Sequence, residues 1–146
     1  MKGKIIFFSL FFLLTITGTA FAQDKKAPSI ISSTASIRKY HNLKELQEMK
    51  KGQLLDLYIE RINVLVKILP YIALVTKPGV TLVDLGIPND SDNVKSLAQQ
   101  VQGTADFLEI TVNFQRRMVP YSDTRNLIAS ILFYESTMKS LHEFEL

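Results

Sequence analysis

The sequence predicts an all-α fold, a small bundle of three long helices plus a short helical turn in the crossover loop, after a cleaved signal peptide and a flexible N-terminal arm. Three observations support this prediction. Long stretches repeat apolar residues with the period of an amphipathic helix, and Pro and Gly residues separate these stretches. The third is that no segment alternates apolar and polar residues as a half-buried strand does.

The beginning of the chain has the pattern of a secretory signal peptide. Lys2 and Lys4 precede an apolar run over residues 5–16, and an A-x-A pattern follows at residues 20–22. The run is shorter than the ~20 residues that a membrane span needs. We therefore expect cleavage near Ala22 and a periplasmic or secreted protein, the alternative being an uncleaved signal anchor.

Charge and cysteine content exclude several classes of function. The leader contains two lysines and no acidic residue, so its removal from a chain with 17 basic and 14 acidic residues leaves a nearly neutral protein. A neutral protein has no strong electrostatic reason to bind nucleic acid. The chain has no cysteine, which rules out disulfides, cysteine metal sites and CxxCH haem attachment.

Composition divides the chain into three parts. Residues 1–22 form the signal peptide. Residues 23–41 are rich in Ser, Thr and Lys without a helical or strand period, which indicates a flexible linker or arm. Three isoleucines in this arm leave open the alternative that it docks on the bundle. Residues 42–146 should form a single helical-bundle domain.

The first long helix has clear start and stop signals. Asn42 and Glu45 have the spacing of a capping box, so we expect the helix to begin at the next residue after Asn42. Its apolar residues cover a broad face. Pro70 lacks the amide that a helix interior needs, which predicts a kink or stop near Leu69.

The connection over residues 76–93 should be an ordered crossover. Thr81 and Asp84 can cap a single helical turn, which Gly86 would end. The loop is also too apolar for a solvated linker, so we expect it to pack against the bundle.

Two further helices follow. The second should run from residue 91 or 93 to 118 and stop before Pro120. The third should begin at residue 122 or 123 and reach about residue 143. The short joint between them predicts an antiparallel hairpin.

The second helix carries two apolar stripes. One extends from Val94 to Val119, and the other lies nearly opposite. The stripes suit a central helix packed between the first and third helices or covered by the crossover, or a surface that docks another subunit or a partner helix. A ligand groove is a third alternative. The candidate partner-binding residues are Phe107, Ile110, Phe114 and Met118.

Arg61 falls among the apolar residues of the first helix on a helical wheel. An unpaired buried guanidinium would cost several kcal/mol, so an inward Arg61 needs an acceptor. Glu135 lies at the margin of the apolar face of the third helix, and Glu109 at a margin of the second. Arg61, Glu109 and Glu135 are therefore candidates for a buried polar cluster. The interpretations are an ion pair that sets helix alignment, an arginine reaching solvent at a rim, or a ligand-binding arginine.

The sequence lacks the residues of common catalytic and metal sites. Its only histidines are His41 and His142, so neither an HExxH motif nor paired Glu-x-x-His motifs occur, and no G-x-S-x-G elbow is present. We expect neither an enzyme nor a metal or cofactor. One alternative is haem, because Met49 and His142 have relative places similar to the haem ligands of small periplasmic b-type cytochromes.

These observations predict an exported, non-catalytic helical interaction protein: an accessory subunit, adaptor or inhibitor of an envelope protein. Its partner would be a protein or a second copy of the chain, with no nucleic acid and no membrane span in the mature chain. The alternative is a periplasmic bundle that binds a small ligand or haem, followed by a small hydrolase.

Overall fold

A computed structural model describes residues 27–143. Helices and helical turns make up 68% of this part, which contains no strand. The α-helices are α2 (Leu43–Gln47), α3 (Lys51–Ile68), α4 (Ser91–Met118) and α5 (Thr124–Glu143), and the 3₁₀ turns are η1 (Leu69–Tyr71), η2 (Val83–Leu85) and η3 (Val119–Tyr121). The prediction of an all-helical chain with three long helices is therefore confirmed. The predicted signal peptide lies outside the described residues.

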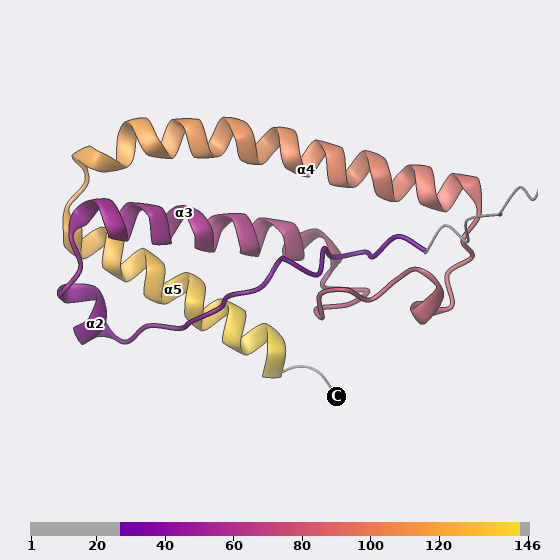
Figure 1. Cartoon of the computed structure of the whole chain (residues 1–146), viewed down its shortest axis with the longest axis horizontal. Helices are drawn as coiled ribbons and strands as arrows, with labels where there is room; N and C mark the ends of the chain where they lie inside the picture. Colours follow the sequence, from indigo (N-terminus) through magenta and orange to yellow (C-terminus); the bar gives the residue numbers. More distant parts are fainter. Residues whose placement is uncertain (1–26, 144–146) are drawn as a thin grey trace, which may run out of the picture.

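Helix α3 is the central element (Figure 1). It packs against α5 on one side and against α4 on the other. The interpretation of the second long helix as the central one is therefore wrong. Seven residues of α3 are buried, whereas Leu108 is the only buried residue of α4. Helix α4 has a polar average composition and contacts α3 along one narrow side, so most of its surface stays exposed.

The first predicted helix is divided into α2 and α3. The capping box is present, because the Glu45 amide donates to Asn42 Oδ1 at 3.0 Å and the Asn42 amide donates to Glu45 Oε2 at 2.9 Å. The helix breaks after Gln47, and Lys50 has extended backbone angles. Gln53 Oε1 accepts from the Lys50 amide at 2.9 Å and so caps a second start. The prediction of one continuous helix is wrong at this point.

The prediction of a flexible arm over residues 23–41 is not confirmed. Ile30 and Ile31 are only 2% and 1% exposed, and they pack against α3 and the crossover loop. The Ile30 amide donates to the Val80 carbonyl at 2.8 Å, and the Gly79 amide donates to the Ile31 carbonyl at 2.9 Å. The arm thus contributes Ile30, Ile31 and Ala35 to the core.

The crossover loop is ordered, as the sequence predicts. Asp84 Oδ2 accepts from the Thr81 amide at 2.8 Å and from its hydroxyl at 2.7 Å. Gly86 ends the turn η2 with φ at +71°, a left-handed conformation that favours glycine. Leu82 is buried against the arm and α3.

The core consists of two clusters of buried side chains. The first combines the arm, the second half of α3, the crossover and α5: Ile30, Ile31, Ala35, Val64, Leu65, Ile68, Tyr71, Leu82 and Met138. The second combines α2 with the first halves of α3 and α5: Leu46, Leu54, Leu127, Ile128 and Ile131. Arg61 in α3 and Glu135 in α5 both lie between residues of the two clusters in sequence.

Between residues 27 and 143, no helix combines the length and the apolar composition that crossing a membrane requires.

Candidate functional sites

Arg61 and Glu135 form a buried ion pair between α3 and α5. Each residue is 1% exposed. The Arg61 guanidinium donates from Nε to Glu135 Oε1 at 2.9 Å and from Nη2 to the same oxygen at 2.7 Å. Of the two carboxylates that the sequence proposes as partners, the structure brings Glu135 to Arg61. Glu109 lies exposed on α4, where it lines a groove between α3 and α4.

The arm completes the polar cluster around this pair. Arg61 Nη2 also donates to the Lys39 carbonyl at 2.6 Å, and Arg61 Nη1 lies 3.0 Å from Glu60 Oε1. The His41 amide donates to Glu135 Oε2 at 2.6 Å, and His41 Nδ1 lies 3.1 Å from Glu135 Oε1. Each nitrogen of the guanidinium therefore has an acceptor.

The cluster keeps Glu135 charged. Burial by itself would raise the pKa of the Glu135 carboxyl, but the His41 amide and ring and the Arg61 guanidinium outweigh it and lower this pKa. The pKa of the Tyr40 hydroxyl shifts in the opposite direction. Burial and the nearby Glu135 charge raise it, and the effect of Arg61, which lowers it, is smaller. A carboxylate with hydrogen bonds on both oxygens suits an alignment role, since it joins the arm, α3 and α5.

The second candidate site is the outer stripe, which we define as Phe107, Ile110, Phe114 and Met118 of α4. These side chains are 55%, 72%, 58% and 48% exposed. Their spacing of three or four residues places them along one face of the helix, about 80° to 160° around the helix axis from the buried Leu108. The structure therefore brings all four predicted partner-binding residues together on an open face.

The inner side of α4 makes few close contacts with α3. Leu97 and Val94 pack at the edge of the first core cluster, and Leu108 is buried further along. Between them and beyond them lie grooves, one of which has a volume of about 480 Å³. Polar contacts hold the far end of the helix: Arg116 Nη1 donates to Asp56 Oδ1 at 3.0 Å in an exposed pair.

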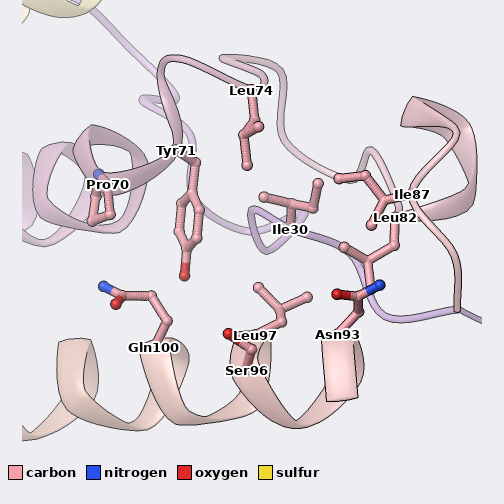
Figure 2. Close-up of a pocket in the computed structure, with 10 residues that line it drawn as sticks. All are labelled: Ile30, Pro70, Tyr71, Leu74, Leu82, Ile87, Asn93, Ser96, Leu97 and Gln100. Carbon is pink, nitrogen blue, oxygen red and sulfur yellow. The ribbon is translucent and has the colours of Figure 1, made fainter. Parts of the chain in front are cut away.

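A pocket of about 340 Å³ opens where η1, the arm and the crossover meet the start of α4 (Figure 2). Its walls are mostly apolar, with Ile30, Leu82 and Leu97 among them. The Tyr71 ring stands in this pocket with its hydroxyl directed at α4, toward Gln100. Tyr71 is 7% exposed, and its hydroxyl has no hydrogen-bond partner in the described part of the chain. Burial raises the pKa of this hydroxyl.

The two residues of the haem alternative lie far apart. Met49 packs against the second core cluster, which includes Leu127 and Ile128 near the start of α5. Residue 142 lies at the other end of α5, which at 1.5 Å per residue is about 20 Å away (Figure 1). Backbone positions this far apart do not suit two ligands of one haem iron. Within residues 27–143, no three His, Cys, Asp or Glu side chains lie close enough together to hold a metal ion.

Sequence reasoning missed two members of these sites. His41 directly precedes the Asn42 cap, so the capping box places it beside the start of α2, but no local pattern indicates that it would contact Glu135. Tyr71 follows Pro70 in the turn η1, and only the tertiary packing of the crossover shows that its hydroxyl is buried.

No family model, curated protein sequence or solved structure matches this chain.

Proposed function

We propose that this chain is an exported, non-catalytic interaction protein that docks a protein partner on the outer stripe of α4. The observation that supports this proposal best is the exposure of four large apolar side chains along one helix face. Monomeric proteins rarely expose contiguous apolar patches of this kind, and aromatic and Met side chains are enriched at interfaces.

The stripe has no evident role in folding. The core clusters are built from the arm, α2, α3, the crossover and α5, and α4 contacts them through its opposite side. Exposed aromatic residues also favour aggregation, so a face that is not needed for stability is expected to have another use. A partner helix laid along the stripe would use the spacing of three and four residues that helix-in-groove recognition employs.

The leader pattern supports an exported location. A basic start, a short apolar run and the A-x-A motif at residues 20–22 favour cleavage near Ala22 and release into the periplasm or the medium. In that compartment the chain would serve as an accessory subunit, adaptor or inhibitor of an envelope protein.

Site-specific photo-crosslinking tests the proposal in cells that produce the chain. A photoreactive amino acid replaces Phe114 in the stripe. In the matched control it replaces Lys95, which is exposed on α4 and lies about 100° around the helix axis from Phe114. We expect a discrete adduct from position 114 and none from position 95. Equal crosslinking at both positions, or none at either, would contradict docking on the stripe.

A second candidate function is the binding of a small apolar ligand in the pocket around Tyr71. The buried hydroxyl without a partner supports it, because an unsatisfied polar group costs free energy that a ligand acceptor would recover. The fluorescence of an anilinonaphthalene probe tests this idea. A signal from the pocket should survive Phe114→Ser and disappear in Leu97→Trp, which fills the pocket; loss in Phe114→Ser alone would place the probe on the stripe.

A further inference from the structure

We infer that the occupant of the outer stripe is a second copy of this chain, with the two α4 helices antiparallel about a twofold axis. This inference rests on the proposed function, since it names the partner for the same face. It is supported by the order of residues along the stripe. That order reads as self-complementary when one copy is rotated onto the other.

The apolar residues share one midpoint. In an antiparallel twofold pair, residues that are equally distant from the axis on either side lie opposite each other. The midpoint in sequence between Phe107 and Met118 falls within about half a residue of position 112. The midpoint between Ile110 and Phe114 does so too. Phe107 of one copy therefore faces Met118 of the other, and Ile110 faces Phe114. Each of these apolar contacts occurs twice in the pair.

Two opposite charges share the same midpoint. The midpoint in sequence between Asp106 and Arg117 also falls within about half a residue of position 112. The two residues lie about 20° apart around the helix, on one flank of the stripe. The twofold rotation keeps that flank on the same side, so Asp106 of each copy would meet Arg117 of the other. Both residues are exposed. In the described chain Arg117 has no ion pair, and Asp106 accepts only from Gln102 Nε2, at 2.8 Å.

The charges also decide the direction of the second helix. In a parallel twofold pair the axis runs along the helices, so the flank that carries Asp106 and Arg117 lies on opposite sides of the interface in the two copies, and neither charge meets its opposite. The antiparallel pair brings each Asp106 next to an Arg117, and opposite charges at close range attract. The chain thus selects the antiparallel arrangement by charge complementarity.

A glycine makes room at each end of the stripe. Gly103 and Tyr121 are equally distant in sequence from position 112, so Tyr121, in η3 just beyond the end of α4, would come near Gly103 of the other copy. Tyr121 is 87% exposed, and no atom lies within 4 Å of the position that a Cβ on Gly103 would occupy. A tyrosine ring of the second copy can therefore lie over the bare backbone of α4.

The bundle leaves this face accessible. Helix α4 forms one outer edge of the bundle, and α3 lies on its inner side (Figure 1). The stripe side chains are between 48% and 72% exposed, so the α4 helices of two copies can come into contact along the stripe.

Sedimentation equilibrium of the purified chain with charge-swap variants tests the inference. We expect a dimer whose dissociation constant rises at least ~10-fold in Asp106→Arg and in Arg117→Asp, because each change opposes like charges twice. The double variant Asp106→Arg/Arg117→Asp restores the pairing with reversed signs, so its dissociation constant should return to within ~3-fold of the original. Circular dichroism and thermal melting should show that each variant keeps its helices.

The outcomes separate this inference from the proposed function. A monomer at ~100 μM, or a dimer that ignores the charge swap, would overturn the antiparallel pair. If position 114 crosslinks to a protein of another mass, the second copy is excluded while docking on the stripe stands. Crosslinking that yields an adduct of twice the chain mass, together with rescue by the double variant, would support both.

Discussion

The Arg61 guanidinium donates two hydrogen bonds to a single oxygen of Glu135, from Nε at 2.9 Å and from Nη2 at 2.7 Å. The other carboxylate oxygen accepts from the His41 amide at 2.6 Å. A buried ion pair is weak evidence of stability compared with apolar residues of the same size, but losing one member leaves an uncompensated charge. Misalignment of the arm, α3 or α5 would separate the pair and leave a buried charge uncompensated, so the pair favours one alignment of these elements.

A double-mutant cycle on this pair should show strong coupling. Arg61→Met leaves the Glu135 carboxylate buried without its cation, and we expect a loss of about 3 to 5 kcal/mol in the free energy of unfolding. Adding Glu135→Gln removes that charge, so the double variant should be more stable than additivity predicts, with a coupling above ~1 kcal/mol. Urea unfolding measures each term. Additive effects would show that the pair is energetically unimportant.

The exposed pair Arg116–Asp56 is a matched control for that cycle. Its atoms lie at a similar distance, 3.0 Å, but both side chains are more than half exposed. Coupling there should be about 0.2 to 1 kcal/mol and should weaken with salt, whereas the Arg61–Glu135 coupling should change little with salt.

The Glu135 carboxyl predicts a dependence of stability on pH. Its pKa in the folded chain lies below the reference value of 4.5, so folding favours its ionised form. That stabilisation is complete above pH 4.5 and is lost as the pH falls through the lowered folded-state pKa. The difference in unfolding free energy between the wild type and Glu135→Gln should therefore be largest at neutral pH and should shrink in acid. A difference that grows toward acid pH would contradict the lowered pKa.

Local signals in the sequence predicted most of the fold. The cap of α2, the turn η2 and the end of α4 before Pro120 each depend on residues close together in the chain. The arrangement of the helices was not predictable in this way. A helix with two apolar stripes fits the centre of a bundle as well as an edge, and only the packing of α3 against both α4 and α5 decides between them.

The candidate sites show the same division. Helical periodicity places Arg61 on the apolar face of α3 and groups Phe107 with Phe114, because both inferences use positions within one helix. The contribution of the arm was not predicted. Residues 23–41 have no period, so nothing local indicates that the Lys39 carbonyl and His41 would close the cluster around Arg61.

The arm should contribute to stability as a core element. Ile30→Ala removes buried atoms from the first core cluster, and we expect a loss of about 2 to 4 kcal/mol in the free energy of unfolding. Val83→Ala is the control, because that side chain is 56% exposed and its truncation should cost less than ~0.5 kcal/mol. Equal small effects would indicate that the arm separates from the bundle in solution.

Two glycines should respond to alanine in opposite directions. Gly86 has φ at +71°, where an L side chain is strained, so Gly86→Ala should cost about 1 to 2 kcal/mol. Gly52 lies in α3, and no atom comes within 4 Å of an added Cβ. Gly52→Ala should therefore stabilise the chain by a few tenths of a kcal/mol to about 1 kcal/mol. Thermal melting of both glycine variants checks these two predictions. Stabilisation by Gly86→Ala would contradict the left-handed conformation of Gly86.

The last prediction compares the two faces of α4. Phe114 is 58% exposed on the outer stripe, whereas Leu108 is 5% exposed on the inner side. At low protein concentration, Phe114→Ser should change the free energy of unfolding by less than ~0.5 kcal/mol. Leu108→Ser leaves a cavity and buries a hydroxyl, so it should cost about 3 kcal/mol or more.

Raising the protein concentration should then separate wild type from Phe114→Ser. A partner copy that binds only the folded chain stabilises it by mass action, so the wild-type melting temperature should rise with concentration while that of Phe114→Ser stays constant. Leu108→Ser retains the stripe, and its lower melting temperature should still rise with concentration. A cost of several kcal/mol for Phe114→Ser at low concentration would instead place Phe114 in the core of the monomer, and the outer face of α4 would then have no surface free for docking.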